Sequence, residues 1–184
     1  RLEYDDLPLM NSLSAEALRK IPQCDAQALG NTAWSFAALS LRDRELMDAI
    51  AAESVVTMSD FNPQNLANIA WAFARLCIED WQLLSAIAAE ALRKISQCIS
   101  QNLTNLAWSC ATSLFQNKPL LSAIASQAIT LISDCGPQDL SNTAWSFATR
   151  AFSDAPFLAA LSAAARRKLA QWDTQNLGNT AWAF

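Results

Sequence analysis

Ten carboxamide side chains recur in pairs along the sequence, and their type and spacing suit them to recognition by hydrogen bonding. In each pair a glutamine precedes an asparagine by four residues, which places both on one ridge of a helix. A carboxamide offers two N–H donors and one acceptor, so the rows either bond neighbouring repeats to one another or bind base edges and ribose. Both interpretations stay open. The pairs are Gln27 and Asn31, Gln64 and Asn68, Gln101 and Asn105, Gln138 and Asn142, and Gln175 and Asn179.

Other polar positions near these pairs vary between copies, as residues that distinguish bases must. If each repeat contacts one nucleotide, these positions would read the bases; an ordinary solvated helix face is the alternative. The candidates for RNA contact lie six residues before, one after and four after a recurring tryptophan. They are Asn65, Asn102, Asp139 and Asn176 at the first position, Ser35, Ser109 and Ser146 at the second, and Arg75, Thr112 and Thr149 at the third.

Basic residues gather at regularly spaced places in the sequence, although the whole chain is acidic, with a net charge of −4. Seven of its 13 cations lie in three clusters. Cations at helix C-termini are favoured by the helix dipole, and a row of such clusters could also contact phosphate. The candidates for phosphate contact are Arg19, Lys20, Arg93, Lys94, Arg166, Arg167 and Lys168.

The chain contains no histidine, and no nucleophile elbow, phosphate loop or paired carboxylates stand out. These features predict neither catalysis nor a histidine-ligated metal site. One position that recurs every 37 residues holds either cysteine or an aromatic residue: Cys24, Phe61, Cys98, Cys135 and Trp172. A position that accepts all three residue types is a packing position, so we expect free thiols. The sequence therefore predicts no enzyme, metal, cofactor or small-molecule substrate.

A repeat of 37 residues organises all these positions. Five tryptophans, each 37 residues from the next, mark a motif Q-x-L-x-N-x-A-W-x-[FC]-A. Each copy predicts two helices, the first opening near an N-cap such as Asp25, Asn62 or Asp173, with proline as the first helical residue in two copies. Two helices cannot bury their apolar faces alone, so stacked neighbours are required. The tryptophans are Trp34, Trp71, Trp108, Trp145 and Trp182.

The predicted fold is all-α, a solenoid of about ten helices forming a single array over residues 1–184. No stretch of the sequence approaches the ~20 apolar residues of a membrane helix, so we expect no membrane insertion. Both ends fall inside a repeat, so the array is expected to continue further. The units are 1–24 as the second half of a repeat, 25–61, 62–98, 99–135 and 136–172 as full repeats, and 173–184 as the first helix of another.

This motif, followed by a second amphipathic helix, resembles the octotricopeptide repeat family over essentially the whole chain. The resemblance implies an array of helical hairpins that binds RNA in a mitochondrion or chloroplast. It also implies other protein subunits as partners, in a larger ribonucleoprotein such as an organellar ribosome. A protein-binding scaffold within a multi-subunit complex is the alternative, which the acidic balance favours.

Overall fold

The computed structural model describes residues 6–184, which form ten α-helices and four short 3-10 turns without any strand. The predicted all-α solenoid is thus confirmed. Residues 1–5, the start of the predicted half repeat 1–24, lie outside the described residues. The first helices of the repeats are α2 (Ala26–Ala38), α4 (Pro63–Arg75), α6 (Ser100–Thr112), α8 (Pro137–Thr149) and α10 (Thr174–Ala183). The second helices are α1 (Leu7–Lys20), α3 (Arg44–Val56), α5 (Trp81–Lys94), α7 (Lys118–Thr130) and α9 (Ala155–Lys168).

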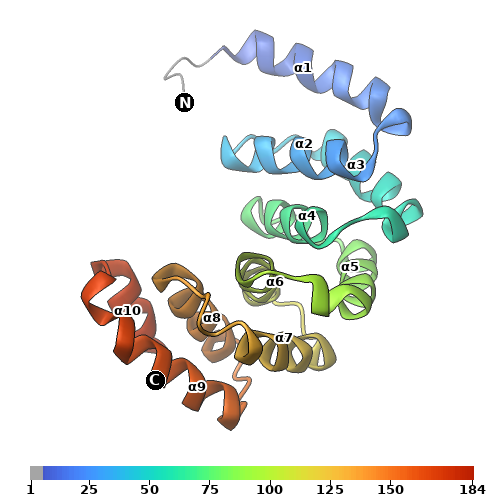
Figure 1. Cartoon of the computed structure of the whole chain (residues 1–184). Helices are drawn as coiled ribbons and strands as arrows, with labels where there is room; N and C mark the ends of the chain where they lie inside the picture. The colour runs from blue at the N-terminus through green and yellow to red at the C-terminus, as the bar shows by residue number, and fades with distance from the viewer. Residues whose placement is uncertain (1–5) are drawn as a thin grey trace.

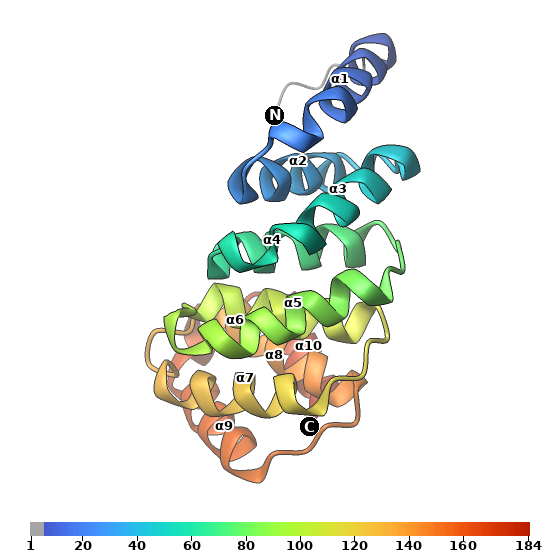
Figure 2. The same cartoon turned by 90° about the vertical axis from the view of Figure 1, so that its right-hand side faces the viewer.

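The helices form two layers. The inner layer, α2, α4, α6, α8 and α10, makes the closest contacts between successive repeats and lies on the concave side of a curved array (Figure 1). The outer helices α3, α5, α7 and α9 are more widely separated, and Figure 2 shows them from outside. The array curves because one layer packs more tightly than the other.

Small residues on the inner helices allow this tight packing. A Cβ atom added at Gly30 would lie 3.6 Å from the Cα of Asn65 on the next inner helix, so even alanine would touch the neighbouring backbone there. The position four residues before each tryptophan holds only small or modest side chains. The five residues are Gly30, Ala67, Thr104, Ser141 and Gly178.

Polar caps begin most helices. The predicted N-caps Asp25, Asn62 and Asp173 each accept a hydrogen bond from the backbone N–H three residues on. A second row of caps on the outer helices was not predicted, although it too recurs every 37 residues. This row consists of Asp6, Asp43, Asp80, Asn117 and Asp154.

Each full inner helix ends in a residue with a left-handed backbone. The φ angles are 58° at Ser40, 53° at Cys77, 57° at Leu114 and 48° at Ala151. The following amide closes the turn in three of these repeats, for example Leu41 N–H donating to the Phe36 carbonyl at 2.9 Å. Such a C-terminal motif is usually made with glycine, which this sequence does not use there.

A continuous apolar core fills the space between the layers. The phase shared by cysteine and aromatic residues is buried, with Phe61 fully enclosed and Cys98 and Cys135 nearly so, which confirms the packing prediction. All five cysteines are free. Burial raises the pKa of the Cys98 and Cys135 thiols to about 11 and that of Cys110 to about 12, so these thiols stay protonated at neutral pH.

Candidate nucleic-acid interface

The tryptophans form a ladder along the inner helices. Ring centroids are 6.2 Å apart for Trp34 and Trp71, 6.2 Å for Trp71 and Trp108, and 6.3 Å for Trp145 and Trp182. Trp34 is 47% exposed and Trp182 62%, while the three between them are half-buried. The tryptophans thus pack against one another, but the indoles also remain accessible, and indoles are platforms on which bases stack.

Sequence reasoning did not include the tryptophans among the ligand-contact candidates. Their spacing from the glutamines and asparagines could have indicated that the tryptophans lie beside these amides. Each tryptophan follows its asparagine by three residues and its glutamine by seven, which places all three on one helix stripe. We call this stripe the amide–tryptophan face.

The glutamine row is free to contact a ligand. All five glutamines, Gln27, Gln64, Gln101, Gln138 and Gln175, are exposed, and within residues 6–184 none of their carboxamides makes a hydrogen bond. The asparagine row is half-buried except for Asn31, which is exposed. One step of the predicted amide ladder is present, since Asn179 Nδ2 donates to Asn142 Oδ1 at 3.3 Å.

The position six residues before the tryptophan does not lie on an exposed face, which departs both from the predicted RNA contact and from its alternative, a solvated helix face. Asn65, Asn102 and Asn176 are 6–9% exposed. Asn65 Oδ1 accepts from the backbone N–H of Asn62, and Asn102 Oδ1 accepts from that of Ile99. Asp139 is half-buried and accepts from Gly136 N–H. Asn65, Asn102 and Asp139 thus close the first turn of their helices, whereas Asn176 Oδ1 accepts from the Ser141 hydroxyl of the preceding inner helix at 2.8 Å. A helical wheel does not show such contacts between repeats.

The other two sets of RNA-contact candidates contain both exposed and buried residues. Ser35 and Arg75 are exposed, whereas Ser109 and Ser146 are buried and donate to the carbonyls of Asn105 and Asn142 in their own helices. Thr112 and Thr149 are half-buried, and their hydroxyl oxygens are enclosed without a hydrogen-bond partner. The structure thus leaves Ser35 and Arg75 as the accessible members of these two sets.

Two of the seven basic candidates are bound to backbone carbonyls of the preceding repeat. Lys94 Nζ donates to the carbonyls of Ser59 and Phe61 at 2.7 Å each, and it lies 2.8 Å from Glu90. Lys168 Nζ makes the equivalent bonds to Ser133 and Cys135. The side chains that remain exposed are Arg19, Lys20, Arg93, Arg166 and Arg167. Arg19 pairs with Glu16 at 2.9 Å, and Arg167 Nε donates to the Ala163 carbonyl of its own helix at 3.2 Å.

The basic clusters lie at one edge of the array. They end the outer helices α1, α5 and α9, and a short 3-10 turn such as Ile95–Gln97 connects each of these three helices to the start of the next inner one. The glutamines also lie in the first turn of the inner helices, so basic edge and glutamine row belong to the same side of the array. A strand of phosphates along this edge could therefore direct bases toward the amide–tryptophan face.

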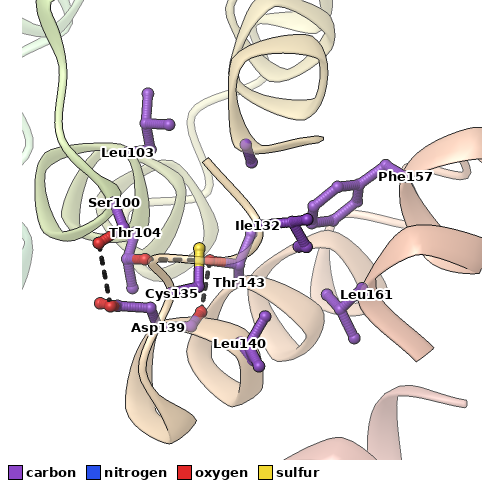
Figure 3. Close-up of a pocket in the computed structure, with 11 residues that line it drawn as sticks. Ser100, Leu103, Thr104, Ile132, Cys135, Asp139, Leu140, Thr143, Phe157 and Leu161 are labelled. Atoms are coloured by element: carbon purple, nitrogen blue, oxygen red, sulfur yellow. Dashed lines mark hydrogen bonds between the residues drawn. The ribbon is translucent and has the colours of Figure 1, made fainter. Parts of the chain in front are cut away.

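An open groove of about 510 Å³ separates the beginnings of α6 and α8. Its walls include Gln101 and Asn105 from α6 and Gln138 and Asn142 from α8. Below it, hydrogen bonds from Ser100 to Asp139 (3.2 Å) and between the hydroxyls of Thr104 and Thr143 (3.1 Å) join the two helices (Figure 3). Phe157 and Leu161 close the apolar side of the small cavity beneath these bonds.

Other kinds of site were sought in the described residues. No cluster of three or more histidine, cysteine, aspartate or glutamate side chains there could hold a metal ion. None of the helices between residues 6 and 184 has the length and apolar character needed to cross a bilayer. The accessible chemistry of residues 6–184 is therefore that of amides and indoles on a concave helical surface.

Fold and face together define a helical-repeat protein with a concave surface suited to planar polar ligands. Residues 1–184 match the family model described as RNA-editing substrate-binding complex 6 protein, and the chain belongs to this family. No curated protein matches the chain at a significant level. The family is one of RNA-related, multi-subunit complexes, which agrees with the coarser part of the prediction. Its description names neither octotricopeptide repeats nor a ribosome, and the expected organellar ribosome has no support.

Proposed function

We propose that this protein binds single-stranded RNA through the amide–tryptophan face, as one subunit of an RNA-editing substrate-binding complex. The observation that carries the proposal is that exposed glutamines and accessible indoles share one concave stripe over five successive helices. Amides form hydrogen bonds with base edges, and indoles stack on bases regardless of sequence. Neither needs a strongly basic surface.

Single strands fit this face better than a duplex. Bases in a duplex are stacked on each other and turn only their groove edges outward, whereas unpaired bases can enter a concave groove. Phosphate contacts in this proposal come from the exposed arginines of the basic edge, namely Arg19, Arg93, Arg166 and Arg167. Binding then depends weakly on salt, with a slope of log K on log salt no steeper than about −3, at about −0.7 per phosphate.

The direct test replaces the glutamine row. A variant carrying Gln27→Ala, Gln64→Ala, Gln101→Ala, Gln138→Ala and Gln175→Ala should keep the helical circular dichroism of the parent, because these side chains are exposed and bond to nothing within residues 6–184. Its affinity for single-stranded RNA, measured by fluorescence anisotropy, should fall at least about tenfold, equivalent to about 1.4 kcal/mol. A variant with Gln82→Ala and Ser126→Ala on the outer helices is the control and should bind like the parent.

A protein-binding scaffold is the second candidate. The acidic total and the internal use of Lys94 and Lys168 favour it, because they leave few cations for nucleic acid. In that case the glutamine variant should lose a protein subunit of the complex in pull-downs while RNA affinity stays at the level of the control.

We further propose that the protein acts in an organelle and by binding alone, without catalysis.

A further inference from the structure

The groove between α6 and α8 differs from the other junctions of the inner layer. Three neighbouring tryptophan pairs pack as tilted rings with centroids 6.2–6.3 Å apart, but Trp108 and Trp145, one helical turn beyond Asn105 and Asn142 of the groove, form no such pair in the described part of the chain. At this junction the small position carries its largest residue, Thr104, whose hydroxyl meets that of Thr143 on α8. The equivalent residues at the two preceding junctions are Gly30 and Ala67.

We infer that this groove is a binding site for one unstacked nucleobase of a single-stranded RNA. The inference rests on the proposed function and deepens it. Four carboxamides, two on each wall, offer donors and acceptors at the opening: Gln101, Asn105, Gln138 and Asn142. Both glutamines are exposed and the two asparagines half-buried, so the polar atoms are within reach of a ligand.

The chemistry of the walls favours a base over a phosphate. Lysine and arginine are absent from the ten residues that line the groove, and the Asp139 carboxylate is one of them. A negative charge repels phosphate but does not prevent amides from bonding the edge of a neutral base. The unpaired indoles of Trp108 and Trp145 lie one helical turn beyond the asparagines and can cover the faces of that base.

The floor of the groove is rigid enough to keep this shape. The Ser100 hydroxyl donates to Asp139, whose carboxylate also caps the first turn of α8 by accepting from Gly136 N–H at 3.0 Å (Figure 3). The Thr143 hydroxyl additionally donates to the Asp139 carbonyl at 2.7 Å. Two hydrogen bonds thus join α6 to α8 below the groove, and two more fix Asp139 and Thr143 within α8, so the groove exists before any ligand binds.

The test compares matched glutamine pairs. Gln101→Ala with Gln138→Ala removes two amides of the groove, and Gln27→Ala with Gln64→Ala removes the same residues at the α2–α4 junction, where the tryptophans stack. The probe is a single-stranded oligouridylate containing 4-thiouridine. We expect the first pair to lose about tenfold in affinity and the second at most about twofold. Photocrosslinks to 4-thiouridine should map to residues 99–110 and 136–147.

A second variant tests the opening itself. Thr104→Ala installs the residue found at the α4–α6 junction and leaves Thr143 bonded to its own helix. This variant should lose the crosslinks and bind more weakly, as α6 and α8 approach and Trp108 meets Trp145. Equal losses from both glutamine pairs, or crosslinks spread evenly over the inner helices, would contradict the proposal that the groove binds a base. Neither result would contradict the proposal that the protein binds RNA. A parent chain that does not bind the oligouridylate at all would overturn both proposals.

Discussion

Two lysines illustrate how single residues join repeats in this protein. Lys94 and Lys168 each cross from an outer helix to two backbone carbonyls of the preceding repeat. The sequence offered them as phosphate contacts, because a helix wheel shows charge but not the carbonyls of a neighbouring turn. Their neighbours Arg93 and Arg167 are exposed.

The first prediction concerns Lys94. Lys94→Met removes three partners at once and leaves the Glu90 carboxylate, 8% exposed, without its close cation. We expect a loss of about 2 kcal/mol in the free energy of unfolding, below the value for fully buried pairs because Lys94 is 21% exposed. Urea unfolding measures it. Arg93→Met, at a side chain that is 76% exposed, should change stability by less than about 0.5 kcal/mol. Equal losses in the two variants would contradict this account of Lys94.

The second prediction uses the buried thiol of Cys110. Its pKa of about 12 lies above the ordinary value of 9.0 because burial disfavours the thiolate. Below about pH 9 the thiol is protonated in both the folded and the unfolded chain, so its contribution to stability is constant. Above that pH the unfolded chain ionises first, and the thiol's contribution falls by up to about 1.4 kcal/mol per pH unit as pH rises toward 12.

The measurement is the difference in unfolding free energy between the parent and Cys110→Ala. This difference should shrink between about pH 9 and pH 11, where the unfolded thiol ionises. Ala107→Gly, which also opens the core on α6 but removes no ionisable group, serves as the control. Its difference from the parent should not change with pH. A constant difference for Cys110→Ala would show that the thiol is not protected from ionisation.

At the scale of helices, the ends were only partly predictable from the sequence. Repeat spacing and capping residues correctly predicted Asp25, Asn62 and Asp173 as N-caps, because a cap acts on its own first turn. The left-handed residues at the helix ends were missed. Glycine is the residue that usually marks such a position in a sequence, and none of these four residues is a glycine, so only the folded backbone shows their φ angles. They are Ser40, Cys77, Leu114 and Ala151.

The third prediction follows from these helix ends. Leu114 adopts a φ of 57° and its side chain is 62% exposed, so it has strained backbone and little burial to lose. Leu114→Gly should stabilise the protein by about 0.5–1 kcal/mol, which thermal unfolding would show as a higher Tm. Ser113→Gly, one residue earlier with a φ of −81°, is the matched control and should destabilise. A lower Tm for Leu114→Gly would mean that its side chain contributes more than the strain costs.

For the molecule as a whole, the solenoid and its core were predictable, because 37-residue periodicity and apolar spacing depend on the sequence alone. The candidate interface was predictable only in part. The glutamine row lies exposed, which the sequence had left open, but Asn65, Asn102 and Asn176 are buried, with Asn65 against Gly30 and Asn176 against Ser141 of the preceding repeat. No single helix encodes such contacts between repeats.

The fourth prediction concerns the shape of the whole array. In Thr104→Ala the α6–α8 junction should come to resemble α4–α6, with Trp108 and Trp145 in contact. A stacked indole pair adds an exciton couplet to the far-ultraviolet circular dichroism spectrum, so the couplet should grow relative to the parent. Ser141→Ala at the α8–α10 junction, where Trp145 and Trp182 already stack, should leave the couplet unchanged. A couplet that stays the same in Thr104→Ala would place the cause of the gap elsewhere.

The α6–α8 junction also has a mechanical consequence. On its outer side the same two repeats are joined by Lys168, which holds the turn before α8. One step earlier the arrangement is reversed, since Trp71 and Trp108 stack inside and Leu131 occupies the lysine position outside. We therefore expect the α4–α6 and α6–α8 junctions to open on opposite sides under load, so that the middle of the array can change its curvature in either direction.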